Sequence, residues 1–198
     1  MPAASPGLLT LFHTVRHLKP VQVYRRLWRA RAGVPLLQPA ERRPSAATWT
    51  PAIHREPTRT GPFRFRFLNE ERELRGWNDA GVPKLWLYNL HYFEAPDCEL
   101  IQRWIEENPP GIGNGWEPYP LSLRIVNWIK WELAGNALTA EALASLAIQA
   151  EYLSHTVEYH LLANHLFENA KALVFAGLFF KADTWLRMGL DILQKQVP

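Results

Sequence analysis

The chain of 198 residues is 47% hydrophobic and 21% charged, which is sufficient for a buried core and unlike a disordered segment. Its net charge of +3 is uneven, because residues 1–66 hold twelve Lys or Arg against two acids, whereas residues 67–198 hold ten against seventeen. The single cysteine, Cys98, excludes an internal disulfide and a cysteine-based zinc cluster. No apolar run reaches the ~20 residues of a membrane-spanning helix. Without a signal-peptide pattern, we expect a cytoplasmic protein, or a periplasmic one if the N-terminus is misassigned.

The basic N-terminal part is predicted to be a helix and a connector. An apolar stripe over residues 13–32 predicts a helix that Pro20 bends or restarts. Residues 33–61 are rich in Pro, Ala, Thr and Arg, as in an extended connector. Two explanations of the charge stay open: a solvated arm or a surface that packs on an acidic partner domain, and attraction of a polyanion such as an acidic polysaccharide or a membrane surface. Nucleic acid is not expected, because no recognition helix or RNA-binding aromatic motif accompanies the charge.

The middle of the chain changes from an extended to a helical pattern. Phenylalanines alternate with arginines over residues 63–67, which predicts a short strand. An aromatic segment at 86–93 follows, and then a helix over 100–107 that two prolines stop. After a glycine-rich turn, an apolar stripe over residues 121–133 predicts a helix that ends at Gly135.

Three further helices are predicted. Thr139 is a good N-cap for the first, whose stripe ends at Leu153; a long helix then covers His155 to about Phe180, and the last covers residues 182–196. Short turns predict hairpins packed side by side, as in a bundle, solenoid or toroid. We expect a basic segment over 1–66 and a partial helical domain over 67–198, because the chain stops directly after a helix.

One segment of the predicted long helix carries an unusual polar face. On a helical wheel, residues 158–174 separate an apolar half from a polar half, which holds His160, Lys171, Asn164, Glu168, His165, Glu158 and Asn169. An ordinary solvated face remains an explanation. Two His and two Asn among seven residues nevertheless suit a half-buried cleft that binds an anion or transfers a proton. No metal or cofactor is expected, since the two histidines are five residues apart, unlike helical ligand pairs.

Three segments in this order resemble the N-terminal helical domain of heparinase II/III-like polysaccharide lyases, especially the alginate-lyase-like bacterial members. They are WLYNLHYF at 86–93, GWEPYPLSLRIVNW at 115–128 and EYHLLANHLFEN at 158–169. The resemblance covers residues 85–196. It implies an all-α chain that forms an incomplete (α/α) toroid with a short basic N-terminal extension, and a β-sandwich domain after it.

The resemblance also implies a reaction, the β-elimination of uronic-acid polysaccharides. Asn164 would neutralise the substrate carboxylate, and His165 would be a second donor or the base. Candidate substrate-binding residues are Arg124, Trp116, Glu117, Tyr119, Asn127, His160 and Asn169, with core packing the alternative for Trp116. The family's catalytic Tyr lies beyond residue 198, so we expect this chain alone to be inactive or nearly so.

Two other functions stay open. A uronyl epimerase uses the same proton abstraction but returns the proton to the carbon. A non-catalytic glycan-binding or scaffold module in surface-polysaccharide metabolism would bind acidic glycans without turnover.

Overall fold

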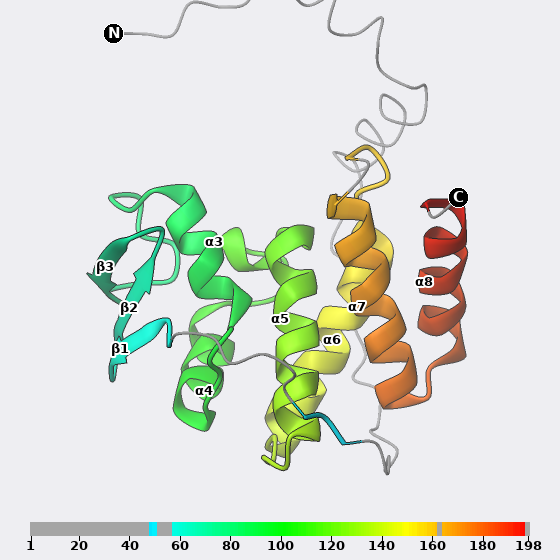
Figure 1. The fold of residues 1–198 in the computed structure, drawn as a ribbon, viewed down its shortest axis with the longest axis horizontal. Coiled ribbons are helices and arrows are strands. Elements are labelled where there is room, and N and C mark those ends of the chain that lie inside the picture. The colour runs from blue at the N-terminus through cyan, green and yellow to red at the C-terminus, as the bar shows by residue number, and fades with distance from the viewer. Residues whose placement is uncertain (1–47, 51–56, 162–163, 197–198) are drawn as a thin grey trace, which may run out of the picture.

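The computed structural model describes residues 48–50, 57–161 and 164–196, which Figure 1 shows as a small sheet followed by a row of helices. The antiparallel sheet consists of β1 (Arg59–Gly61), β2 (Arg64–Phe67) and β3 (Glu70–Glu73), in that spatial order. Within the described residues six α-helices follow: α3 (Lys84–Tyr92), α4 (Cys98–Glu107), α5 (Pro118–Leu133), α6 (Ala140–Thr156), α7 (Asn164–Phe180) and α8 (Asp183–Gln196), with the short 3₁₀ helix η1 (Asn114–Trp116) before α5.

The chain is therefore mainly α, and the sheet corrects the all-α expectation. Among the described residues no helix has both the length and the apolar composition needed to cross a bilayer. The helix predicted over 13–32 and most of the predicted connector lie outside the described residues.

The predicted strand is the middle one of the sheet, and β1 and β3 on its two sides were not predicted. Phe65 and Phe67 of β2 are buried while its two arginines are exposed, so the alternation is confirmed. Leu68 and Asn69 then adopt positive φ angles of 53° and 62°, which turn the chain into β3. Phe67 packs edge-on against Trp86 of α3, with ring centroids 5.1 Å apart. The boundary expected between residues 66 and 67 thus falls inside β2, and the sheet belongs with the helices.

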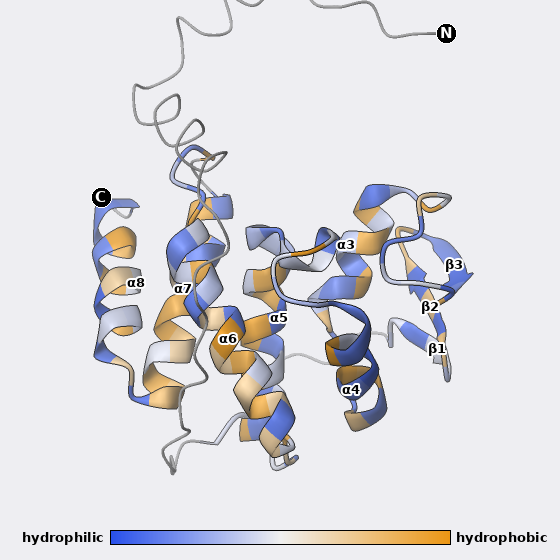
Figure 2. Cartoon of the chain, turned by 180° about the vertical axis from the view of Figure 1, so that it is seen from behind, coloured by the Kyte–Doolittle hydropathy of each residue, from blue (hydrophilic) through white to orange (hydrophobic). Residues whose placement is uncertain are grey.

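The helices alternate between two layers. α3, α5 and α7 contact one another in sequence in one layer, and α4, α6 and α8 do so in the other. Each helix is followed by one in the opposite layer, and the predicted side-by-side packing of consecutive helices is found for α5, α6, α7 and α8. Figure 2 shows α7 hydrophilic toward its start and hydrophobic toward its end. The N-terminal ends of α3, α5 and α7 meet at one edge, because Lys84 pairs with Glu117 and Asn169 bonds to Pro118.

A buried arginine lies at the centre of this arrangement. Arg124 of α5 is fully buried, and its Nε donates to Oε1 of Gln149 on α6 at 2.9 Å. Its Nη1 donates to the carbonyl oxygen of His91 on α3 at 3.4 Å, and its guanidinium carbon lies 3.7 Å from the ring centroid of Trp104 on α4. Its partners in the described part of the chain are neutral, and burial lowers the Arg124 pKa. One side chain therefore ties four helices together.

His91 extends this buried network. Its Nε2 donates to the carbonyl of Trp77 at 2.9 Å, and its Nδ1 accepts from the indole of Trp104 at 3.0 Å. Burial, and then the nearby charge of Arg124, lower the pKa of His91 to about 3. A Cβ on Gly115 would lie 2.6 Å from His91 Nδ1, so only glycine fits there. Part of the glycine-rich turn therefore serves core packing.

The prediction of one long helix over His155–Phe180 is wrong. α6 ends at Thr156, whose hydroxyl donates to a carbonyl of the last turn at 2.8 Å. The N–H of Glu158 then donates to Oδ1 of Asn169 at 2.8 Å, which satisfies the backbone at the break. Because α7 begins at Asn164, the residues 158–161 lie in a turn and do not share a helical face with it.

Acidification should destabilise the fold through His91. The unfolded chain binds a proton near pH 6.5, whereas the native chain does so only near pH 3, so stability is complete above pH 6.5 and falls with pH below it. Between pH 7 and pH 5 we expect this residue to remove roughly 2 kcal/mol from the free energy of unfolding. Urea unfolding at both pH values measures the change. His91→Gln should flatten this dependence and the exposed His155→Gln should not; equal slopes for His91→Gln and the parent chain would contradict the assignment.

Candidate functional site

The start of α7 presents the two residues on which the sequence argument centres. Asn164 is exposed, and the side chain of His165 is 34% exposed. His165 lies one helical turn before the buried Asn169, so both lie on the side of α7 that faces α5. The pair therefore stands at the edge where the odd-numbered helices begin.

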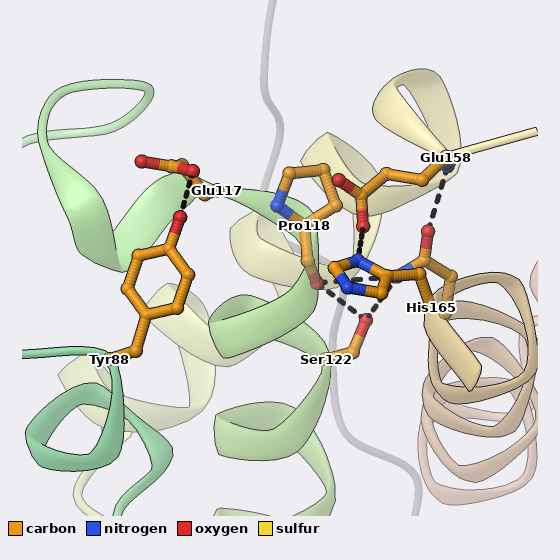
Figure 3. A network of polar contacts seen from close by, with 7 residues as sticks. Tyr88, Glu117, Pro118, Ser122, Glu158 and His165 are labelled. Carbon is orange, nitrogen blue, oxygen red and sulfur yellow. Dashed lines mark hydrogen bonds and ion pairs between the residues drawn. The ribbon is translucent and has the colours of Figure 1, made fainter. Parts of the chain in front are cut away.

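A buried carboxylate orients His165. Its Nδ1 lies 3.0 Å from Oε2 of Glu158, whose side chain is only 7% exposed (Figure 3). In the neutral imidazole Nδ1 donates to this carboxylate, so Nε2 carries the lone pair. The arrangement is that of a general base whose tautomer is set by an acidic neighbour.

A layer of hydrogen bonds beneath the pair joins α5 to α7. Asn169 is fully buried, and its Nδ2 donates to Oγ of Ser122 at 3.0 Å and to the carbonyl of Pro118 at 3.4 Å. Ser122 Oγ donates to the same carbonyl at 2.7 Å, as Figure 3 shows. Since Oδ1 of Asn169 also accepts from the N–H of Glu158, this amide positions the carboxylate that orients His165. Asn169 is thus a positioning residue, which corrects the expectation that it contacts substrate.

Tyr119 at the start of α5 covers the other side of the pair. Its ring centroid lies 4.4 Å from that of His165, with the planes 35° apart. The side chain of Asn164 lies near its hydroxyl. Burial and the negative charge of Glu168 raise the pKa of Tyr119. Glu168 itself pairs with Lys171 at 2.5 Å. Tyr119 is therefore a neutral phenol in contact with both predicted catalytic residues.

Glu117 forms a second polar group on the side toward α3. Its Oε2 accepts a short hydrogen bond from the hydroxyl of Tyr88, and its Oε1 lies 2.8 Å from Nζ of Lys84. Burial, and then Glu117, raise the pKa of Tyr88 to about 12. Figure 3 shows Tyr88 and His165 on opposite sides of Pro118. The edge thus carries polar groups from three consecutive odd-numbered helices.

Several predicted substrate-binding residues lie elsewhere. Arg124 is fully buried and Trp116 is 3% exposed, so both belong to the core and neither lines an open cleft. Asn127 is half-buried and donates to the carbonyl of Tyr92 at 2.8 Å, which ties α5 to α3. His160 is half-buried in the turn before α7. Of the predicted set, Asn164, His165, Tyr119 and Glu117 lie along the shared edge.

Two features of the site were not assigned from the sequence. Glu158 was placed on the polar face but was not recognised as the partner of His165. On one continuous helix two residues seven positions apart are two turns apart, so this pair can form only because the helix is interrupted between them. Tyr92 was not singled out; its ring packs edge-on against Tyr119 at 6.1 Å. Only the folded chain brings α3 beside α5, so no local pattern indicated this contact.

The described residues also form a cavity, but no cluster of potential metal ligands. A cavity of about 430 Å³ lies between the start of α7 and α8, where Tyr159 and Leu166 line it together with residues of α8. Over the described ranges no cluster of three or more His, Cys, Asp or Glu side chains could hold a metal ion.

Comparisons with known proteins leave the family assignment as a prediction. No protein-family model, curated protein or solved structure matches the chain. A function for this chain is therefore inferred from the sequence resemblance and from the geometry of the site.

Two asparagines on α7 should respond differently to truncation. Asn169→Ala leaves the N–H of Glu158 without its buried acceptor and removes the bond that Ser122 accepts, so we expect a loss of about 1–3 kcal/mol in the free energy of unfolding. Asn164→Ala, at an exposed position, should change it by no more than about 0.5 kcal/mol. Urea unfolding at pH 7 distinguishes the two variants. Equal losses would show that Asn164 has a structural role as well.

Proposed function

We propose that the chain carries the uronate-binding part of a polysaccharide lyase. The observation that supports this most is the contact of Asn164, His165 and Tyr119, with Glu158 orienting the imidazole, at an accessible edge. The two-layer array of helical hairpins agrees with the start of an (α/α) toroid, which we include in the proposal. The carboxylate of a uronate is the ligand for which this donor set is best suited.

The roles follow from the charge that the reaction develops. The proton on C5 of a uronate becomes acidic only when the adjacent carboxylate is neutralised, because the electron pair of the C–H bond moves toward the carboxylate oxygens. The amide of Asn164 donates to these oxygens without titrating. The start of α7 adds the partial positive charge of a helix N-terminus. Binding and activation therefore use the same contacts.

His165 is the base in the proposed reaction. Its Nε2 accepts the C5 proton, and Glu158 stabilises the resulting imidazolium through Nδ1. The double bond then forms between C4 and C5 as the C4–O bond breaks, and an acid protonates the departing oxygen. By the resemblance, a Tyr after residue 198 takes part in this proton transfer and a β-sandwich domain completes the cleft. The residues of this chain thus supply the carboxylate contact and the base of the proposed reaction.

Binding of uronate oligomers tests the proposal directly. The 198-residue chain is titrated calorimetrically with oligomers of mannuronate, guluronate and glucuronate, and we expect at least one to bind. Asn164→Ala should weaken that binding roughly tenfold or more, since a hydrogen bond to a charged group contributes ~1.5–3 kcal/mol. The matched control is Asn136→Ala, which removes an exposed asparagine that bonds to the carbonyl of Trp131.

Ultraviolet absorbance of the unsaturated product reports elimination in the same samples. Binding without absorbance from a longer protein that includes the catalytic Tyr would favour the glycan-binding module, and epimerised product without cleavage would favour the epimerase. No binding to any uronate, or equal affinities for Asn164→Ala and the parent chain, would refute the assignment.

A further inference from the structure

Three tyrosines form a cluster beside the proposed uronate site. Tyr88 and Tyr92 come from α3, and Tyr119 comes from the first turn of α5. All three are half-buried, so each keeps part of its ring accessible. Tyr92 packs edge-on against Tyr119 at 6.1 Å, and Tyr119 in turn lies 4.4 Å from His165. The cluster is therefore continuous with the residues that would hold the uronate.

The hydroxyl groups of this cluster differ in their partners. Tyr88 donates to Glu117, and the hydroxyl of Tyr119 lies near the side chain of Asn164. Tyr92 makes no hydrogen bond through its hydroxyl within the described part of the chain, although it lies near both other phenols. Burial raises the pKa of all three, so they are neutral at physiological pH. A neutral phenol whose hydroxyl bonds to none of the described residues can donate to an uncharged ligand hydroxyl.

Core packing alone does not account for three tyrosines at this position. The large aromatic residues of the core, such as Trp104 and Trp128, are completely buried, whereas the three tyrosines are not. Partly exposed aromatic rings that carry hydroxyls suit sugars, whose rings offer C–H faces for stacking and hydroxyls for hydrogen bonds. The flanking pair of Lys84 and Glu117 adds a further donor and acceptor at the rim.

We propose that Tyr119, Tyr92 and Tyr88 form a saccharide subsite that holds the sugar residue next to the uronate bound at Asn164 and His165. This inference rests on the proposed function, and it fixes the direction of the bound chain. The oligosaccharide runs from the start of α7 across α5 toward α3. The neighbouring sugar stacks on the tyrosine rings and donates or accepts at the Tyr92 hydroxyl.

The length dependence of binding tests this subsite. Uronate monomer, dimer and trimer of one linkage are titrated into the 198-residue chain, and affinity should rise with length. Tyr92→Ala should abolish that rise, with a loss of roughly tenfold for the trimer and little change for the monomer. Tyr92→Phe keeps the stacking face and removes only the hydroxyl, so it should retain most of the increase. Thermal unfolding of each variant verifies that the fold is intact, and Tyr88→Ala replaces Tyr92→Ala if the latter unfolds.

The outcomes separate this proposal from the one on which it rests. Asn164→Ala should weaken all three ligands equally, because it acts on the first uronate. If Asn164→Ala weakens binding but Tyr92→Ala and Tyr88→Ala leave the length dependence unchanged, the subsite is wrong and the uronate site stands. If only the tyrosine variants matter, the chain binds sugars without the proposed carboxylate contact. Equal affinity for monomer and trimer in the parent chain would overturn the subsite outright.

Discussion

A guanidinium group buried among neutral partners constrains the whole structure. Removing a cation from water costs several kcal/mol, and within the described residues the compensation comes from Gln149, the carbonyl of His91 and the face of Trp104. These partners belong to three helices, and Arg124 belongs to a fourth. The cost is offset only when all four helices occupy their places together. The position of α5, and hence of Tyr119 one and a half turns before Arg124, follows from that requirement.

The proposed site is built in the same way, as an accessible layer above a buried one. Asn169, Ser122 and the carbonyl of Pro118 form hydrogen bonds away from water and join α5 to α7. Asn164 and His165 lie one turn above them and are accessible. The buried layer sets the distance between α5 and α7, and the positions of Asn164 and His165 follow from that distance. Placing reactive groups on helix starts rather than on long loops limits their motion without burying them.

The sequence predicted the regular parts of this protein better than its interruptions. Apolar stripes located α4, α5, α6 and α8, and Thr139 caps α6 as expected by accepting from the N–H of Ala142. The break before α7 depends on Asn169 accepting from a residue eleven positions earlier, which leaves no trace in hydrophobic periodicity. Arg124 was misplaced because a charged residue in a motif with polar neighbours favours a surface role. Asn164 and His165 lie at an accessible edge, and their chemistry stays a prediction.

The alternation of the two layers has a consequence for how such a protein can diversify. Segments that lead into α5 and α7 end at the polar edge, whereas the turns after those helices lie at the opposite edge, as at Gly135 between α5 and α6. Substitutions that change ligand specificity and insertions that lengthen a turn can therefore accumulate at opposite edges of the molecule. An insertion after α5 would lengthen a turn remote from Asn164, while even a short one before α7 would displace Glu158. The architecture thus separates the edge that carries the proposed site from the edge where the chain can lengthen without moving it.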